Sequence, residues 1–223
     1  MTNPVRQPYV VDLGAGDGTA TTPILARGAK VAAIDISEEQ LHRFREITAS
    51  YSEQVDVICG DAHNVLDGWT RPCDMVLAVS FLHHIPDYLG LVERAARLLR
   101  HGGVLFTFQD PMAYDSVRRF DRLFSVTSYG FWRIFRGDLV GGVARYTRRR
   151  RRIYLDECEA DSVEYHVVRS GVDQRRIRQI LEDMGFRTKI IEYHSTQSPF
   201  WQRVGDRLSI KNQFSVIAKK LDL

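Results

Sequence analysis

Short apolar runs alternate with helical patterns along the first 110 residues, and this alternation restricts the chain to a small set of folds. Five runs have the length and β-branched content of buried strands: residues 9–13, 30–34, 55–58, 73–80 and 104–108. Strands that are separated by helices imply right-handed βαβ units, and therefore a parallel sheet with helices on its faces. Two later runs, 187–193 and 214–219, have only a loop between them, which suits an antiparallel pair. The pattern predicts an α/β protein.

Helix boundaries can be placed between these runs. We expect a first helix over about residues 19–26, which Gly28 stops. Ser37 with Gln40 three residues later has the pattern of a capping box and predicts where the second helix begins. Asp173 stands where an N-cap is expected for a later helix. These signals agree with the βαβ alternation.

Composition and cysteine spacing exclude several other classes of protein. The 223 residues are 44% hydrophobic and 26% charged, which is ordinary for one globular domain over residues 1–223. The three cysteines lie far apart, so neither a disulfide framework nor a zinc site is predicted. The longest apolar stretch, residues 75–82, is far shorter than the ~20 residues of a membrane span. We expect a soluble, cytoplasmic protein without a metal site or a membrane partner.

Residues 111–170 interrupt the alternation and differ in charge from the rest of the chain. Residues 118–152 contain eleven arginines and two acidic residues. Aromatic residues recur at helical spacing in the first part of this region, although Gly130 is expected to interrupt a helix there. We therefore expect residues 111–170 to form a mainly helical insertion after strand five, which serves as a lid or substrate segment.

The arginines of this insertion permit two interpretations. The run Arg148 to Arg152 can bind the phosphates of a nucleic acid. Five acidic residues follow the run directly and can pair with it, and a run of charges is most often a solvated surface. A small-molecule partner is therefore preferred, and nucleic acid is the less favoured alternative.

A glycine-rich loop follows the first predicted strand. Residues 12–18 read DLGAGDG, and Asp35 ends the second strand roughly 20 residues later, the distance at which doubly wound folds place a carboxylate on a ribose. Glycines allow a sharp turn and a close approach of a ligand to the backbone. The third glycine comes one residue too early for the dinucleotide pattern, and Asp12 and Asp17 suit a cation better than a pyrophosphate. The loop predicts a site for a cationic nucleoside.

Two further motifs follow the third and fourth strands: Gly60-Asp61-Ala62 and Ser80 to Ile85. With the glycine loop and Asp35, these motifs resemble those of the class I S-adenosylmethionine-dependent methyltransferases. The resemblance implies a Rossmann-like, seven-stranded, mostly parallel sheet of order 3-2-1-4-5-7-6 with strand seven antiparallel. It also implies that S-adenosyl-L-methionine is the cofactor. The residues that it implies at this cofactor are Asp12, Gly14, Ala15, Gly16, Asp35, Ile36, Asp61, Ala62, Val79 and Ser80.

The resemblance assigns Asp35 to the ribose diol, Asp61 to the adenine amino group and Val79-Ser80 to the sulfonium. Asp61 can alternatively cap a short helix, or can serve both purposes. His84, and after it His83, are the candidate catalytic residues, because an imidazole at the substrate edge can take a proton from an acceptor hydroxyl or ammonium. The alternative is that one of these histidines orients the loop through backbone hydrogen bonds and the other faces solvent. His166 is a further candidate base.

The resemblance implies transfer of a methyl group to an oxygen or nitrogen of a small-molecule metabolite, in bacterial natural-product biosynthesis. Three alternatives remain open: an RNA or protein methyltransferase that uses the arginine-rich insertion, a non-catalytic S-adenosylmethionine-binding scaffold, and an enzyme that uses the cation without methylating. Few residues precede the first strand, where relatives usually carry helices. We therefore expect residues 112–165 to cover the cofactor site and to be a contact in a homodimer. The alternatives are a second subunit that covers the site and an unusually open site.

Overall fold

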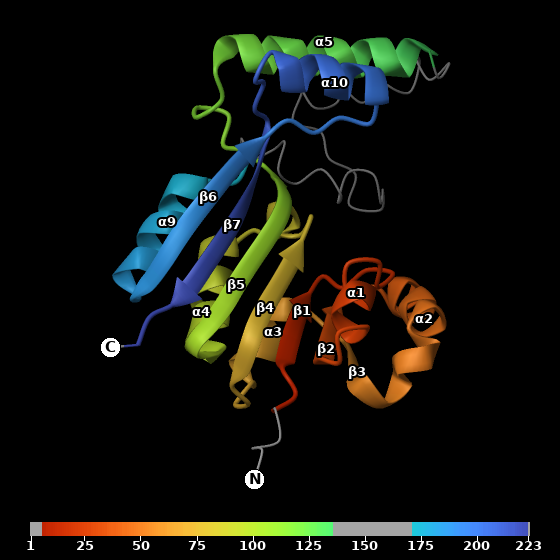
Figure 1. The fold of residues 1–223 in the computed structure, drawn as a ribbon, viewed down its shortest axis with the longest axis vertical. Coiled ribbons are helices and arrows are strands. Elements are labelled where there is room, and N and C mark those ends of the chain that lie inside the picture. The colour runs from red at the N-terminus through yellow and green to blue at the C-terminus, as the bar shows by residue number, and fades with distance from the viewer. Residues whose placement is uncertain (1–5, 136–170, 223) are drawn as a thin grey trace.

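The computed structural model describes residues 6–135 and 171–222 and contains a seven-stranded sheet (Figure 1). Its strands are β1 (Tyr9–Leu13), β2 (Lys30–Asp35), β3 (Val55–Cys59), β4 (Cys73–Val79), β5 (Leu99–Pro111), β6 (Phe186–Tyr193) and β7 (Gln213–Lys220). Their order is β3-β2-β1-β4-β5-β7-β6. Neighbouring strands from β3 to β5 are parallel, whereas β7 is antiparallel to both β5 and β6. The predicted sheet and strand order are confirmed.

Helices cover both faces of this sheet. They are α1 (Thr22–Leu25), α2 (Glu38–Ile47), α3 (Ala62–Asp67), α4 (Tyr88–Leu98), α5 (Arg119–Phe135), α9 (Gln174–Asp183) and α10 (Pro199–Arg207), with 3-10 helices η1 (Ala49–Gln54) and η2 (Leu82–His84). Val11 of β1 packs in a core with Leu91 of α4 and Ile177 of α9. The next side chain back, Val10, points to the other face and packs with Leu25 of α1. Strands that are buried on both faces explain why their sequences are almost continuously apolar.

Two of the predicted helix starts are confirmed by their caps. The Ser37 hydroxyl accepts a hydrogen bond from the Gln40 backbone N–H at 3.3 Å, at the start of α2. A carboxylate oxygen of Asp173 accepts from the N–H groups of Arg175 and Arg176, both at 3.0 Å, at the start of α9. Each cap satisfies backbone donors that have no partner inside the helix.

The predicted first helix is too long, because α1 covers only Thr22–Leu25. Gly18, just before it, has φ of +85°, which lies outside the helical region. The Gly18 carbonyl accepts hydrogen bonds from the N–H groups of Thr21 and Thr22, at 3.1 and 2.9 Å, so the chain turns before it becomes helical. The glycine loop therefore uses residues that periodicity alone assigned to the helix.

Two expectations for the carboxyl-terminal half are wrong. Helix α5 continues through Gly130 without interruption, over Arg119–Phe135. The connection between β6 and β7 is not only a loop, because it contains α10, which starts at a Ser198 cap. The antiparallel pairing of β6 and β7 is nevertheless confirmed. Both helices are held by contacts between them, which a local pattern does not show.

Helices α5 and α10 lie side by side beyond the carboxyl end of β6, at one end of the molecule (Figure 1). Trp201 of α10 joins them: its ring lies 5.8 Å from the ring of Phe124, edge-on, and 5.9 Å from the ring of Phe131, stacked. We call α5 and α10 together the cap.

Several expectations fall on residues outside the described part. They are the second part of the 111–170 insertion, the Arg148 to Arg152 run and His166. The division into one domain over 1–223 with an inserted 111–170 segment stays a prediction. Over residues 6–135 and 171–222, no helix is long and apolar enough to cross a membrane.

Candidate active site

The glycine loop is fixed to the end of the neighbouring strand by its own backbone. The N–H groups of Gly14 and Ala15 both donate to the Ile34 carbonyl of β2, at 2.9 and 3.0 Å. Gly14 has φ of +68°, which disfavours a residue with a side chain. A Cβ at position 14 would also overlap the ring of Phe81, which packs against the loop. Glycine is required here by both conformation and space.

Asp35, at the carboxyl end of β2, is the centre of the site. One of its carboxylate oxygens accepts from the Gly16 N–H at 2.9 Å, and the other accepts from the Ser37 N–H at 2.9 Å. A carboxylate has about four acceptor positions, so these two bonds orient Asp35 and leave capacity for a diol. The space in front of Gly16 is open, because no atom lies within 4 Å of where its Cβ would be. Ile36, the next residue, is 73% exposed beside this space.

The third strand brings its own carboxylate to the same edge. The Gly60 N–H donates to the Asp35 carbonyl at 2.9 Å, which joins the end of β3 to the end of β2. Asp61 follows and accepts from the Asn64 N–H at 3.1 Å, as the N-cap of α3. The capping interpretation of Asp61 is thus confirmed. Asp61 is half-buried and Ala62 is buried beneath it, so a ligand can still reach the carboxylate.

Asp12 lies under the loop rather than on its surface. Its side chain is 1% exposed and accepts a hydrogen bond from the Thr21 hydroxyl. Burial raises the pKa of Asp12 to about 7, the Thr21 bond opposes this rise, and the nearby charge of Asp35 adds to it. Asp12 can therefore influence a bound cation through its charge but does not present a surface ligand.

Val79 and Ser80 end β4 beside the loop. Ser80 has φ of +53°, and its N–H donates to the Phe108 carbonyl of β5 at 2.6 Å. Val79 is half-buried and Ser80 is exposed. The turn at Ser80 directs the chain into η2, which contains both candidate histidines.

His83 forms a buried pair with a carboxylate that the sequence reasoning did not select. Its Nδ1 lies 2.9 Å from Asp110 Oδ1, and its backbone N–H donates to the same oxygen at 3.2 Å. His83 is 9% exposed and Asp110 is fully buried. Burial raises the pKa of Asp110, and the hydrogen bond from His83 opposes this rise. The His84 ring lies 4.0 Å from the His83 ring, centre to centre.

Asp110 reaches this position because β5 runs further than predicted, to Pro111, and is irregular at its end. Gln109 has φ of +64°, and the pairing with β7 shifts register between Thr107 and Asp110. Within the described residues, the second oxygen, Asp110 Oδ2, has no hydrogen-bond partner. One signal in the sequence could have pointed to Asp110: the carboxyl ends of adjacent parallel strands meet at one edge of the sheet.

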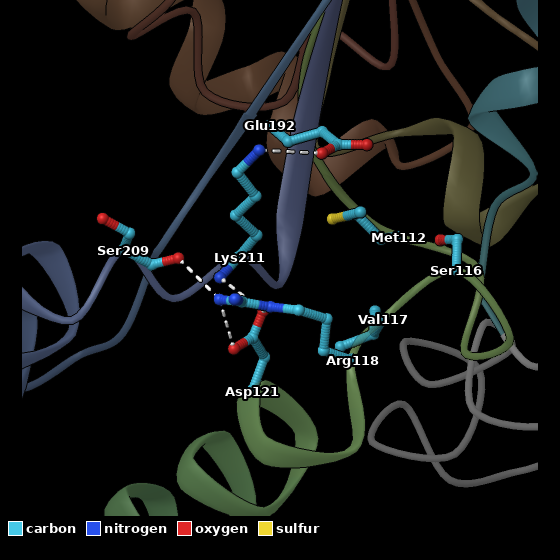
Figure 2. Close-up of a pocket in the computed structure, with 8 residues that line it drawn as sticks. All are labelled: Met112, Ser116, Val117, Arg118, Asp121, Glu192, Ser209 and Lys211. Carbon is cyan, nitrogen blue, oxygen red and sulfur yellow. Dashed lines mark hydrogen bonds and ion pairs between the residues drawn. The ribbon is translucent and has the colours of Figure 1, made fainter.

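A cavity of about 290 Å³ lies at the start of the cap (Figure 2). Arg118 donates to both Asp121 oxygens, at 2.9 and 2.8 Å, and to the Ser209 carbonyl at 3.0 Å. Lys211 Nζ donates to Glu192 Oε2 at 3.1 Å. Each cation of this cavity is paired with an anion, so the cavity itself does not select for an anionic ligand. The lining residues are Met112, Ser116, Val117, Arg118, Asp121, Glu192, Ser209 and Lys211.

Comparison with known proteins identifies the domain. Residues 11–105, which hold the glycine loop, Asp35, Asp61 and both histidines, match the methyltransferase domain family. This part of the chain is similar to a methyltransferase domain, which confirms the resemblance to class I S-adenosylmethionine-dependent methyltransferases. The matched residues lie on the part of the sheet where the candidate site was found.

Curated relatives match less than half of the chain. One is the ubiquinone biosynthesis O-methyltransferase of Xanthomonas oryzae pv. oryzae strain PXO99A, 32% identical over 115 residues, which are 47% of this chain and 48% of the relative. Another is the enzyme of the same name from Idiomarina loihiensis, 30% identical over 97 residues, 44% of this chain and 40% of the relative. These matches span less than half the length of either relative.

Solved structures share the fold over nearly the whole chain. A SAM-dependent methyltransferase from Archaeoglobus fulgidus has a TM-score of 0.59 at 18% identity, covering 96% of this chain and 86% of the other. Magnesium protoporphyrin IX methyltransferase from Synechocystis PCC 6803, crystallised with bound SAH, has a TM-score of 0.53 at 17% identity, covering 96% and 74%. At these identities the likeness concerns the fold.

Proposed function

We propose that this protein binds S-adenosyl-L-methionine at the carboxyl edge of β1, β2 and β3 and transfers its methyl group to a small-molecule acceptor. The observation that carries the proposal is the Asp35 carboxylate, which two backbone N–H groups hold at the rim of an open space in front of Gly16. An oriented acceptor pair beside a glycine loop suits the diol of a ribose.

The residues around this space fit the other parts of the cofactor. Asp61 would accept a hydrogen bond from the adenine amino group, with Ala62 next to it. Ile36 offers an exposed apolar surface to one face of the base. The methionine portion would lie along the backbone of Gly14, Ala15 and Gly16. The sulfonium would lie against Val79 and Ser80. Asp12, beneath the loop, would stabilise the positive charge once it is ionised.

The reaction needs alignment first and a base second. S-adenosylmethionine, when bound, supplies a methyl group on a positively charged sulfur. The protein must hold the acceptor atom in line with that methyl group, and such positioning can lower a barrier by about 7–11 kcal/mol. If the acceptor is a hydroxyl, its proton must leave as the oxygen–methyl bond forms, and a base that takes the proton contributes a factor of about 10²–10⁴.

The geometry favours His83 over His84 as that base. Asp110 fixes the His83 ring and, by accepting at Nδ1, favours the tautomer in which Nε2 is the basic nitrogen. It would also stabilise the imidazolium formed after proton transfer, as carboxylate–histidine pairs do. Asp110 acts through His83 and is therefore a positioning residue. His84, whose ring packs against that of His83, remains the second candidate.

An oxygen acceptor is the better supported choice. A base is needed for a hydroxyl, and both curated relatives described above are named O-methyltransferases. A small metabolite of bacterial natural-product biosynthesis stays our proposal for the acceptor class. RNA or protein as acceptor, and a non-catalytic scaffold, are the alternatives. A homodimer and a cytoplasmic location also stay predictions.

Cofactor binding is tested by titration calorimetry with S-adenosylmethionine. The Asp35→Asn variant should bind about 100-fold more weakly, because hydrogen bonds to a charged acceptor contribute about 1.5–3 kcal/mol each. Glu38→Gln, an exposed carboxylate three residues later, is the matched control and should bind as the unmodified protein does. Absence of heat with this compound, together with binding of a nicotinamide dinucleotide, would refute the proposal.

Turnover separates the acceptor classes. Formation of S-adenosylhomocysteine with a panel of small phenols and hydroxy acids would support the proposal. Methylation of RNA or of a protein in place of these compounds would select the first alternative. Tight cofactor binding without turnover on any acceptor would select the scaffold.

A further inference from the structure

The cap exposes large apolar side chains on both α5 and α10. Phe120, Leu123 and Phe131 of α5 are 58%, 63% and 50% exposed, and Phe200 of α10 is 66% exposed. At 100° per residue the three α5 side chains fall within about 80° of one another, and the buried Asp121 and Ser128 point about 60–160° away from them. We call Phe120, Leu123, Phe131 and Phe200 the apolar ridge.

Contacts between the two helices make the ridge continuous. The Trp201 ring stacks on Phe131 at 5.9 Å and meets the Phe200 ring edge-on at 5.1 Å. Phe124 supports Trp201 from below and also contacts the buried His194 ring. The exposed rings therefore stand on a packed base. Grouped apolar side chains that stay exposed on such a base mark an interaction surface.

Basic side chains flank the apolar ridge on both helices. Arg119 and Arg122 of α5 and Arg203 and Arg207 of α10 are all exposed. The acid of α5, Asp121, is buried and paired with Arg118, so it adds no negative charge to the surface. In α10 the exposed Asp206 accepts from Gln202. The described surface of the cap is thus an apolar strip with positively charged edges.

We propose that the apolar ridge docks this protein on the surface of a bilayer that contains anionic phospholipid, with α5 and α10 lying in the plane of the interface. Amphipathic helices with aromatic and leucine side chains on one side and arginines beside them bind in this way. Each basic residue near an anionic surface adds to the attraction. Figure 1 shows the two helices side by side at one end of the molecule, so that both can meet a flat surface together.

This docking requires no membrane span and is independent of the methyl transfer. It differs from the sequence-based expectation of no membrane partner, which rested on the search for a span. A protein partner would have to place an acidic, apolar surface against the same strip. The test below distinguishes a bilayer from a protein partner.

The test uses the full chain without cofactor and vesicles of phosphatidylcholine, either alone or mixed with phosphatidylglycerol. Co-sedimentation should show at least about tenfold tighter binding to the mixed vesicles, because several arginines act together, and the difference should shrink as salt is added. Quenching of tryptophan fluorescence by brominated lipid should accompany binding, because Trp201 lies directly under the ridge.

Variants locate the contact. Leu123→Glu and Phe200→Glu should each weaken binding to the mixed vesicles at least about tenfold. Arg122→Gln should weaken it about fivefold and leave binding to phosphatidylcholine unchanged. Ile47→Glu is the matched control, an exposed apolar residue of α2 at 48% exposure, and should bind as the unmodified protein does. Thermal unfolding checks that each variant is folded.

Two results would overturn the proposal. The first is that the unmodified protein does not sediment with the mixed vesicles at low salt, or that Ile47→Glu loses binding as much as Leu123→Glu. The second is a dimer in solution that Leu123→Glu dissociates while no vesicle binding occurs, which would assign the ridge to a second copy of the chain.

Discussion

The candidate cofactor site at the sheet edge and the cap are held together by different interactions. At the ends of β1, β2 and β3, small residues and backbone N–H groups position the side chains, as the bonds from Gly16 and Ser37 to Asp35 show. In the cap, large rings position one another, as Phe124, Phe131 and Trp201 do. The first region is fixed by hydrogen bonds between residues close to the sheet, the second by packing between segments far apart in the sequence.

This difference determines what each region tolerates. At Gly14 the glycine loop has no room for an added Cβ, which would overlap the ring of Phe81, so a single methyl group can disturb the loop there. A cap of aromatic rings can adjust to a lost contact, because apolar packing is not directional. Substitutions at the sheet edge should therefore have larger effects than substitutions in the cap, and four experiments examine this order.

The largest effect is expected at His83. His83→Ala should lower kcat about 10²–10⁴-fold while the affinity for S-adenosylmethionine stays the same, because the base contacts the acceptor and not the cofactor. Asp110→Asn should lower kcat less than His83→Ala does. It should also shift the pH dependence of the rate, because Asp110 fixes the tautomer of the His83 ring and stabilises its protonated form. Initial rates across pH measure both. His84→Ala is the comparison, and a larger loss there would make His84 the base.

The second effect concerns Gly14. Gly14→Ala should destabilise the folded protein by about 2–4 kcal/mol, because Ala at positive φ is strained and its methyl group displaces Phe81. Gly28→Ala is the matched control: its φ is +82°, but no atom lies within 4 Å of the new Cβ. Gly28→Ala should lower the free energy of unfolding by about 1–2 kcal/mol. Equal losses in urea unfolding would show that Phe81 does not constrain the loop.

The third effect is the pH dependence that Asp12 confers. Because its pKa is raised to about 7, Asp12 keeps a proton in the folded protein that it has lost in the unfolded chain. Its contribution to stability is therefore full at acidic pH, below the ordinary Asp pKa, and is lost as pH rises through about 7. Asp12→Asn should remove about 2–3 kcal/mol of the fall in unfolding free energy between about pH 5 and pH 8.

The same titration should couple to the ligand. Ionised Asp12 favours a nearby cation, so S-adenosylmethionine should bind more tightly as pH rises through about 7, and Asp12→Asn should flatten this dependence. An unchanged pH profile in both stability and binding would show that Asp12 does not titrate in this range.

The smallest effect is expected in the cap. Asp121 is buried and joins the start of α5 to the segment before β7 through Arg118 and the Lys211 N–H. Asp121→Asn should lower the unfolding free energy by about 1–2 kcal/mol and increase amide exchange in α5. Asp115→Asn, at an exposed carboxylate, should change neither. A loss larger than that of Gly14→Ala would contradict the proposed order of the two regions.

The sequence could predict that the glycine loop, Asp35 and Asp61 lie at one sheet edge, because the signals for this arrangement are local. The glycine loop, Asp35 and Asp61 each lie directly after a strand, and parallel strands place their carboxyl ends at one edge. The pairing of His83 with Asp110 was not predicted from the sequence. Asp110 was passed over because the irregular pairing around Gln109, which brings it to His83, arises from the contact of β5 with β7.

In the carboxyl-terminal half, too, the sequence failed to predict features of two helices. Gly130 has low helix propensity, yet α5 continues through it because the helix is held by rings on either side of that position. Helix α10 was missed because it is short and its start, Ser198-Pro199, also resembles a turn.

What the amino-acid sequence determined was the alternation of strands and helices along the chain, the glycine loop and the two carboxylates around it, because periodicity, glycine conformation and the handedness of βαβ crossovers act over short stretches of chain. The spatial order of the strands was implied by the family resemblance. What only the tertiary structure decided was the pairing of His83 with Asp110, 27 residues away, and the joining of α5 to α10. Such contacts depend on how strands and helices that are distant in sequence settle against one another, and no local pattern contains that information.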